Sequence, residues 1–290
     1  MYIEAITVCV NYSDFLAHTL PLNRQHFDYW VVVTSREDVD TQRLCRHHGI
    51  ECLITDRFYD GGDPFNKAKG INEGLLYHGK RDWMVHIDAD IVLPPNFRQM
   101  VEKMNLDKEA IYGADRLMCP DFDSWLKYVQ KPRPMYENWI FIHLDVFPIA
   151  TRVADYNGVG YAPIGYFQMW HPQKSKQLLY PEEHGAADRT DMAFGKLWKR
   201  EKRFLMPEVV VIHIDSENAT VKSMGKNWQG RKTIPFGYVG TPPQEALKKT
   251  KKWKRYAVNT LLILTSFALG GALTYFINNY LLENNLVLWK

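Results

Sequence analysis

The sequence Trp83-Met84-Val85-His86-Ile87-Asp88-Ala89-Asp90-Ile91-Val92-Leu93-Pro94-Pro95 is an apolar run that contains two carboxylates one residue apart. Side chains two positions apart in an extended chain point the same way, so we expect Asp88 and Asp90 to face one site. Mg2+ and Mn2+ are hard ions that typically take one or two carboxylates together with phosphate oxygens. The stretch therefore predicts a buried strand that ends at a site for a cation and a phosphate.

The same Asp-x-Asp spacing occurs twice more, at Asp38–Asp40 and Asp121–Asp123. The spacing alone therefore has low specificity, and for these two copies we expect solvated turns. The copy at Asp88 differs because a strand-like run precedes it and Pro94-Pro95 follows it. Ligands of open α/β sheets collect at the carboxyl ends of strands, so this context favours a functional site.

Strand-like and helix-like segments alternate along the first part of the chain. Apolar and β-branched runs predict strands at 3–10, 29–34 and 50–55, before the strand that ends at Asp88. Helical patterns lie at 16–26, 41–48 and 65–78, with Gly49 as a C-cap, Asp63 as an N-cap and Pro64 at a first helical position. This alternation predicts an α/β fold with a mostly parallel sheet.

The pattern is less regular after residue 96. We expect a helix at 97–104, a strand at 110–114 and a buried strand at 209–215 with His213 near its end. The acidic segment 182–191 opens a helix in which Asp188 and Asp191, three residues apart, would share a face. Acids in a first turn are also favoured by the helix dipole without any catalysis.

The segment 158–172 combines glycines with aromatic residues. Glycine lets the backbone approach a ligand closely, and flat aromatic faces commonly hold sugar rings. Tyr166 and Trp170 are therefore candidates for binding an acceptor. The alternative is that this aromatic cluster belongs to the core.

Composition and charge narrow the classes of function. The chain is 46% hydrophobic and 13% aromatic, as globular proteins are. Its net charge is +3, but six positive charges fall within 248–255. The part before them is slightly acidic, which argues against nucleic-acid binding. The four cysteines show no Cys-x-x-Cys spacing, so neither a zinc site nor a disulfide framework is indicated, and we expect a reducing compartment.

The C-terminal region contains 21 residues without a charged side chain, at 257–277. This length crosses a bilayer core of about 30 Å, and the basic cluster before it fits a cytoplasmic flank. We expect a catalytic domain at 1–245, a basic juxtamembrane segment at 246–255, a transmembrane helix at 256–278 and a tail at 279–290. The protein would be tail-anchored with its body cytoplasmic. The alternative is a helix that lies in the interface or packs on a partner.

Several of these segments, in this order, resemble the glycosyltransferase family 2 type of the GT-A fold over most of residues 1–240. The resemblance is carried by Asn11-Tyr12-Ser13, Thr34-Ser35, Lys67-Ala68 before Asn72, Asp88-Ala89-Asp90, the acidic helix start and His213. It implies a Rossmann-like nucleotide-binding fold with a mixed, mostly parallel central sheet. It also implies a nucleotide-sugar donor and Mn2+ or Mg2+ as cofactor.

The resemblance further implies roles for individual residues. Those implied to bind the donor are Val10, Asn11, Tyr12, Thr34, Ser35, Asp56, Lys67, Asn72 and Asp88. Those implied to hold the metal are Asp88, Asp90 and His213. The family's Glu-Asp pair is replaced here by Thr190-Asp191 or Ala187-Asp188, so the general base that the resemblance implies is Asp191 or, alternatively, Asp188.

Two departures from the family limit what the resemblance implies. The second strand ends in Thr34-Ser35-Arg36-Glu37 where the family has Asp-Asp-Gly-Ser, so the carboxylate that binds the base stays open. The Gln-x-x-Arg-Trp motif of processive synthases is not present, which argues against a polysaccharide synthase.

The sequence thus predicts a metal-dependent, inverting glycosyltransferase that acts on a hydroxyl of a lipid-linked or glycan acceptor. A metal-dependent nucleotidyltransferase is one alternative, but it should have a glycine-rich phosphate loop where this chain has Asn11–Asp14. A non-catalytic, membrane-tethered protein that binds a nucleotide sugar or glycan is the other.

Overall fold

The computed structural model describes residues 1–79, 82–119, 122–130, 161–163, 165–175, 179–184 and 190–214. The chain divides into two units, Met1–Tyr238 and Val239–Lys290, and every described residue belongs to the first. The predicted segments at 246–255, 256–278 and 279–290 therefore lie outside the described residues. Within the described ranges, no helix is long and apolar enough to cross a membrane.

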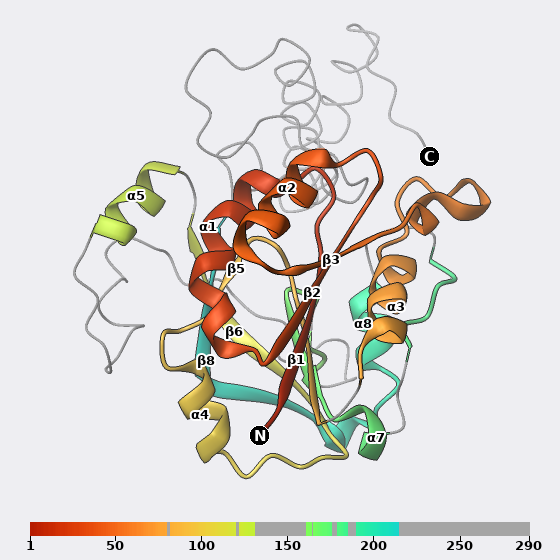
Figure 1. Ribbon diagram of the computed structural model, residues 1–290. Helices are drawn as coiled ribbons and strands as arrows, with labels where there is room; N and C mark the ends of the chain where they lie inside the picture. The colour runs from red at the N-terminus through yellow and green to blue at the C-terminus, as the bar shows by residue number, and fades with distance from the viewer. Residues whose placement is uncertain are drawn as a thin grey trace, which may run out of the picture. The chain divides into compact units, whose positions relative to one another are not determined.

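The described residues form one eight-stranded sheet with the order β3-β2-β1-β4-β7-β6-β8-β5 (Figure 1). Its strands are β1 (Ile3–Val8), β2 (Tyr29–Thr34), β3 (Glu51–Ile54), β4 (Trp83–Ile87), β5 (Ile91–Val92), β6 (Ile111–Cys119), β7 (Phe167–Trp170) and β8 (Arg203–Ile214). The parallel pairs are β1 with β2, β1 with β4, β2 with β3, and β6 with β8. The antiparallel pairs are β7 with β4, β7 with β6, and β5 with β8. The predicted α/β fold with a mixed, mostly parallel sheet is confirmed.

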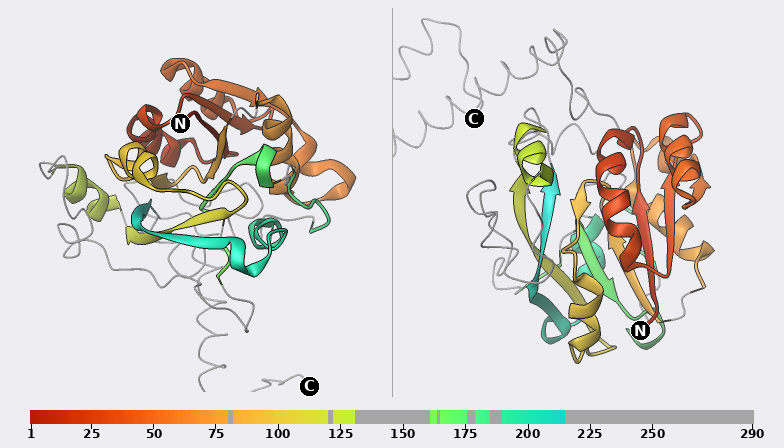
Figure 2. Two further views of the ribbon diagram at one scale, coloured as in Figure 1. Left: turned by 90° about the horizontal axis from the view of Figure 1, so that it is seen from below. Right: turned by 60° about the vertical axis from the view of Figure 1, so that its left-hand side comes forward.

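Helices cover both faces of the parallel part of the sheet (Figures 1 and 2). The α-helices are α1 (Ser13–Asn23), α2 (Val39–His48), α3 (Lys67–Tyr77), α4 (Phe97–Lys103), α5 (Phe122–Gln130), α7 (Pro172–Ser175) and α8 (Thr190–Gly195). The 3-10 helices are η1 (Arg24–His26), η2 (Arg57–Gly62) and η3 (Arg200–Lys202). Side chains along β1 point alternately to the two faces of the sheet, so a helix layer packs on each face. Ile3 and Ala5 pack in one core with α1, while Ile6 and Val8 pack in a second core with α3.

Helix ends show where local sequence signals succeeded and failed. Gly49 follows α2 in the left-handed conformation with φ of 62°, which confirms the predicted C-cap. The predicted N-cap at Asp63 is wrong, because α3 begins at Lys67 and the side chain of Asn66 accepts a hydrogen bond from the Lys69 amide. Asp63 instead accepts from the Lys69 ammonium group at 2.7 Å.

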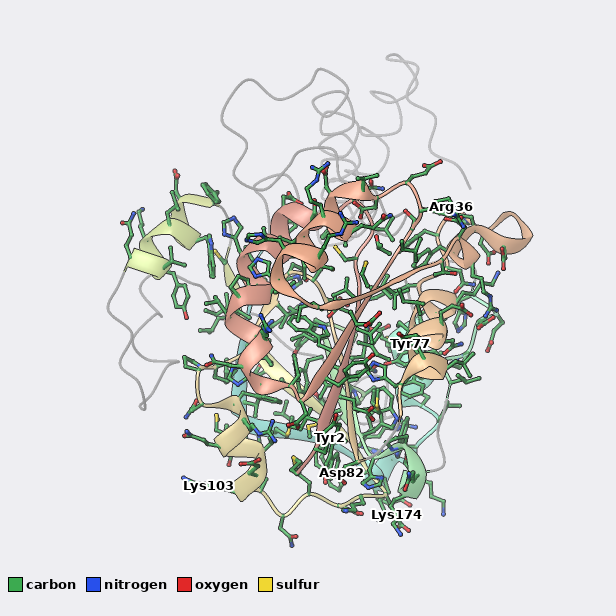
Figure 3. The ribbon with its side chains drawn as sticks, in the orientation of Figure 1. Tyr2, Arg36, Tyr77, Asp82, Lys103 and Lys174 are labelled. Carbon is green, nitrogen blue, oxygen red and sulfur yellow. The ribbon has the colours of Figure 1, made fainter. Side chains whose placement is uncertain are left out.

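The crossing of the chain between β3 and β4 defines the place where a ligand is expected. From β1 the chain adds β2 and β3 on one side, then crosses to place β4 on the other side of β1. In open α/β sheets, ligands bind outside the carboxyl ends of the strands at such a switch point. Figure 3 shows Tyr2 and Asp82, which precede β1 and β4, at the opposite end of the sheet from Arg36, which follows β2.

Candidate active site at the carboxyl ends of β1 and β4

Asp88 opens a tight turn between β4 and β5, and Asp90 lies within it. The Ile91 amide donates to the Asp88 carbonyl at 3.2 Å, and Ala89 and Asp90 have turn conformation. The expectation of an extended chain across this motif is therefore wrong, because the chain turns here so that β5 can pair with β8. Burial raises the pKa of Asp88, the charge of Lys67 opposes that rise, and the charge of Asp90 adds to it.

Two side chains of α1 hold the backbone of this turn. The Thr19 hydroxyl donates to the Ala89 carbonyl at 2.6 Å. The Asn23 amide group donates to the Ile91 carbonyl at 2.7 Å and accepts from the Leu93 amide at 2.9 Å. Thr19 and Asn23 are one helical turn apart and both are buried. Sequence analysis missed them, although two polar residues on the apolar face of a helix were a usable signal.

Lys67 brings a positive charge to Asp88. As the first residue of α3, it donates from its ammonium group to Asp88 Oδ1. His86, fully buried in β4, has its Nε2 3.5 Å from the same oxygen. Burial, and then the charge of Lys67, hold the pKa of His86 well below its usual range, so the ring is neutral. Burial raises the pKa of Asp88, and Lys67 opposes that rise.

The pairing of β5 with β8 brings His213 to Asp90. Ile91 lies opposite His213 in this pairing, and the Ile214 amide donates to the Asp90 carbonyl at 2.8 Å. His213 Nε2 consequently lies 3.2 Å from Asp90 Oδ2. Burial acts to raise the pKa of Asp90, but contact with His213 and the charge of Lys67 outweigh it and lower the pKa below its usual value. Asp90 is therefore ionised at neutral pH.

The donor set matches a cation that shares its coordination with phosphate. Asp90 Oδ1 is buried and has no hydrogen-bond partner among the described residues. Across the same part of the chain, no group of three or more His, Cys, Asp or Glu side chains is arranged to hold a metal ion. Asp88 pairs with Lys67, and Asp90 pairs with His213, so the three predicted ligands do not form one closed cluster. One or two carboxylates with phosphate oxygens are what Mg2+ usually takes.

Asp191, the predicted base, lies at the start of α8 with both carboxylate oxygens bonded to backbone amides. The Gly165 amide donates to Oδ2, and the Met192 amide donates to Oδ1 at 2.8 Å. A Cβ atom on Gly165 would lie 2.6 Å from the Asp191 Cβ, so the close approach requires glycine. Burial, then the charges of Asp191 and Asp88, raise the pKa of Tyr180 well above its usual value.

The alternative base, Asp188, lies outside the described residues.

Residues predicted to bind the donor follow β1 and β2. Val10 and Tyr12 are buried, whereas Asn11 between them is exposed and has a positive φ of 57°. The Asn11 amide donates to Asp38 Oδ2 at 2.7 Å, and the Thr34 hydroxyl donates to the same atom at 3.2 Å. Asp38 is thus buried and joins the ends of β1 and β2, so the expectation of a solvated turn at this residue is wrong.

The remaining predicted donor residues are separated by the structure. Ser35 is buried just after β2. Asp56 is exposed and accepts from the amide and the Nε of Arg36, both at 3.1 Å, and these hydrogen bonds lower its pKa. Asn72 is buried in α3, where it accepts from the Tyr180 amide at 2.7 Å and donates to Glu182 at 2.7 Å. Asn72 therefore attaches the segment around Tyr180 to α3, and its amide group is committed there.

The two residues predicted to bind an acceptor are buried. Trp170 has no exposed surface and contacts the Phe194 ring at a centroid distance of 5.0 Å. Tyr166 is 5% exposed, and its hydroxyl donates to the Ala114 carbonyl. The structure corrects both predictions, because β7 lies between β4 and β6 in the sheet, and both Trp170 within it and Tyr166 just before it belong to the core.

Besides Thr19 and Asn23, the sequence analysis missed three further polar residues of the site. Gln168 lies opposite His86 in the β4–β7 pairing. Its amide group donates to the carbonyls of Pro163 at 2.8 Å and Asp191 at 2.9 Å, and it accepts from the Tyr180 hydroxyl at 2.5 Å. The other two are His86 and Arg116, whose guanidinium contacts His213. Gln168 and His86 are polar residues inside apolar strands, and this was the signal that could have found them, whereas Arg116 follows Asp115 in β6 and gave no such signal.

Comparison with known proteins gives weak likenesses to solved structures. No family model matches the chain, and no curated protein matches it. Structures of glucosyl-3-phosphoglycerate synthase from Mycobacterium tuberculosis match at 14% identity with Mn2+ and UDP bound, and at 17% with Mg2+ and UDP bound. Each match has a TM-score of 0.30 and spans 40% of this chain and 43% of that chain.

A mycobacterial protein matches over a longer stretch, with 11% identity, a TM-score of 0.43, and coverage of 73% of this chain and 65% of that chain. Likenesses at these levels do not identify the activity of this chain.

Proposed function

We propose that this protein is a metal-dependent glycosyltransferase that moves a sugar from a nucleotide-diphosphate donor to a hydroxyl of a lipid-linked or glycan acceptor. The observation that carries the proposal is the placement of Asp88 and Asp90 at the carboxyl end of β4, beside the switch point at β1. This is where α/β sheets bind nucleotides. Lys67 on Asp88 and the unpaired, buried Oδ1 of Asp90 supply groups for a diphosphate and its cation.

The proposed roles follow from the charges of the site. Mn2+ or Mg2+ held by Asp90 Oδ1 with Asp88 would supply Lewis-acid stabilisation of the leaving diphosphate. The Lys67 ammonium group is a compact point charge, so it can leave Asp88 and bind a phosphate oxygen instead. Asp191 is oriented by two backbone amides and would take the proton of the acceptor hydroxyl, with Asp188 as the alternative. One base and no nucleophile correspond to inversion at the anomeric carbon.

The location of the protein is part of the same proposal. We infer that residues 256–278 anchor the chain in a membrane, with residues 1–245 on the cytoplasmic side, and the uncharged run and the basic segment before it support this. Full-length protein in isolated membranes should resist extraction at alkaline pH. External protease should digest the catalytic domain without detergent. Release by alkali would contradict the anchor.

The proposed activity is tested by a panel of nucleotide sugars with Mn2+ or Mg2+, measured as released nucleotide. Asp90→Asn should lower turnover at least about 100-fold, since charge stabilisation worth several kcal/mol is lost. Asp40→Asn is the matched control, because Asp40 ends the other fully described Asp-x-Asp copy, is exposed and pairs with Arg43. It should keep turnover within about two-fold. No turnover of any donor with either metal would refute the proposal.

A further inference from the structure

Cys45 and Cys52 come together where α2 meets β3, an end strand of the described sheet. Gly49 ends α2 in the left-handed conformation, and the Ile50 amide donates to the Cys45 carbonyl at 2.9 Å. The chain therefore turns back tightly between the two cysteines. The structure thus forms a pair of thiols that no Cys-x-x-Cys spacing marks in the sequence.

Both side chains lie on the same face of the sheet. Cys52 lies opposite Val32 in the parallel pairing of β2 with β3, and residues in register share a face. Val32 and Cys45 belong to one hydrophobic core, and Cys52 packs against it. The thiols of Cys45 and Cys52 form a hydrogen bond with each other. The two sulfur atoms are therefore neighbours in the native fold.

The two thiols differ in exposure and in acidity. Cys45 is fully buried, and its hydrogen bond with Cys52, followed by burial, raises the pKa of its thiol far above the usual value. Cys52 is half-buried, and the hydrogen bond from Cys45 lowers the pKa of its thiol, although burial opposes this effect. The charge of Arg46 lowers the same pKa further. Because the thiolate is the nucleophilic form, Cys52 is the thiol that reacts first.

A surface pocket gives a small molecule access to Cys52. Its volume is about 360 Å3, and Cys52 lines it together with Arg46 and Glu51. A water molecule takes about 30 Å3 in the liquid, so a small hydroperoxide fits into this pocket. Cys9 differs from Cys52 in this respect, because it is buried and its sulfur lies 3.3 Å from the Thr41 hydroxyl.

We propose that Cys52 and Cys45 form a dithiol that reacts with small hydroperoxides and closes to a disulfide. The Cys52 thiolate attacks one oxygen of the hydroperoxide, an S–O bond forms, and the O–O bond breaks. The leaving alkoxide or hydroxide takes up the proton that the Cys52 thiol released. The Cys45 thiol then attacks the sulfenic sulfur, an S–S bond forms, and the S–O bond breaks with release of water. The two thiols lose two electrons, and the hydroperoxide is reduced to an alcohol, or to water, and one further water.

The disulfide would join the end of α2 to β3, and excess small thiols would reduce it again by exchange. Reversible disulfides of this kind occur in reducing compartments, where they act as redox sensors. Neither cysteine has a part in the proposed sugar transfer, so the reaction is independent of whether the protein is a transferase.

Peptide mapping of the full-length protein tests the reaction without any variant. The reduced protein is freed of reductant and treated with hydrogen peroxide, and the remaining thiols are alkylated. Trypsin cleaves after Arg46, between the two cysteines, so the disulfide should join the peptides 44–46 and 47–57. The joined pair should vanish with dithiothreitol, the other two thiols should stay alkylatable, and the protein should run as a monomer on a non-reducing gel. No disulfide, a disulfide that includes Cys9, or a linked dimer would overturn the proposal.

Variants test the separate roles of the two thiols. Cys45→Ser keeps the nucleophile, so Cys52 should stop at the sulfenic acid, which dimedone traps. Cys52→Ser should slow the loss of thiols at least about ten-fold, because a buried thiol of raised pKa holds little thiolate. Cys9→Ser replaces another buried cysteine as the matched control and should leave the rate of disulfide formation unchanged. An unchanged rate in Cys52→Ser, or no dimedone adduct on Cys52 in Cys45→Ser, would refute these roles.

Discussion

Replacing Asn23 tests whether α1 positions the carboxylate turn. Asn23→Ala removes two hydrogen bonds, to the Ile91 carbonyl at 2.7 Å and from the Leu93 amide at 2.9 Å. Both are buried, and the two backbone groups lose their partner. A hydrogen bond contributes about 1 kcal/mol net, and each group left unsatisfied costs about 1–3 kcal/mol. We expect the free energy of unfolding to fall by about 3 kcal/mol, and the melting temperature by about 6–12 °C.

Thermal denaturation followed by circular dichroism measures this change. Thr19→Val removes a single hydrogen bond to the Ala89 carbonyl and should cost about half as much. Asn105→Ala replaces an exposed asparagine and should change the free energy of unfolding by less than about 0.5 kcal/mol. Asn23→Ala should also lower turnover, because Asp90 lies within the loosened turn. A melting temperature equal to that of Asn105→Ala would refute the reasoning.

Three further predictions concern other parts of the fold. Burial is the main cause that lowers the pKa of His26 from 6.5 to about 4, so the unfolded chain binds its proton first on acidification. The free energy of unfolding should fall as the pH drops from about 6.5 to about 4, by at most about 1.4 kcal/mol per pH unit. Urea unfolding at several pH values should show that the free energy of unfolding of His26→Gln depends less on pH than that of the native protein. Trp170→Ala should lower the free energy of unfolding by about 3–5 kcal/mol in the same assay. If Trp170 bound an acceptor instead, the substitution would change KM and leave the free energy of unfolding unchanged. Gly165→Ala would place a Cβ 2.6 Å from Asp191 and should reduce turnover, while Gly195→Ala, where the nearest atom would be 3.4 Å away, should not; equal rates for the two variants would contradict a role for that close approach.

The parts of the fold that were predictable from sequence depend on neighbours along the chain. The strand at 29–34 matches β2, and Gly49 ends α2 as expected, because β-branched runs and a left-handed C-cap are local signals. The start of α3 was misplaced because Asp63 and Asn66 both resemble N-caps. In the structure Asn66 accepts from the Lys69 amide and caps α3, whereas Asp63 accepts from the Lys69 ammonium group.

The candidate site was only partly predictable because it is built from distant segments. The carboxylate pair was found from its apolar context. The contact of Asp90 with His213 depends on the antiparallel pairing of β5 with β8, and β5 has only two residues, Ile91–Val92. A strand so short leaves no periodic pattern in the sequence. The burial of Trp170 likewise follows from the place of β7 inside the sheet, which no local pattern encodes.

The order of strands in the sheet also has a consequence for synthesis of the chain. β4 is made early, but its partner β7 begins at Phe167, and β8 ends at Ile214. While the chain emerges from the ribosome, β4 is therefore an unpaired sheet edge, and such edges readily associate with other chains. Arg116 and His213, 97 residues apart, meet only after both later strands have been made. The nascent protein can thus assemble its first four strands well before it possesses a complete site.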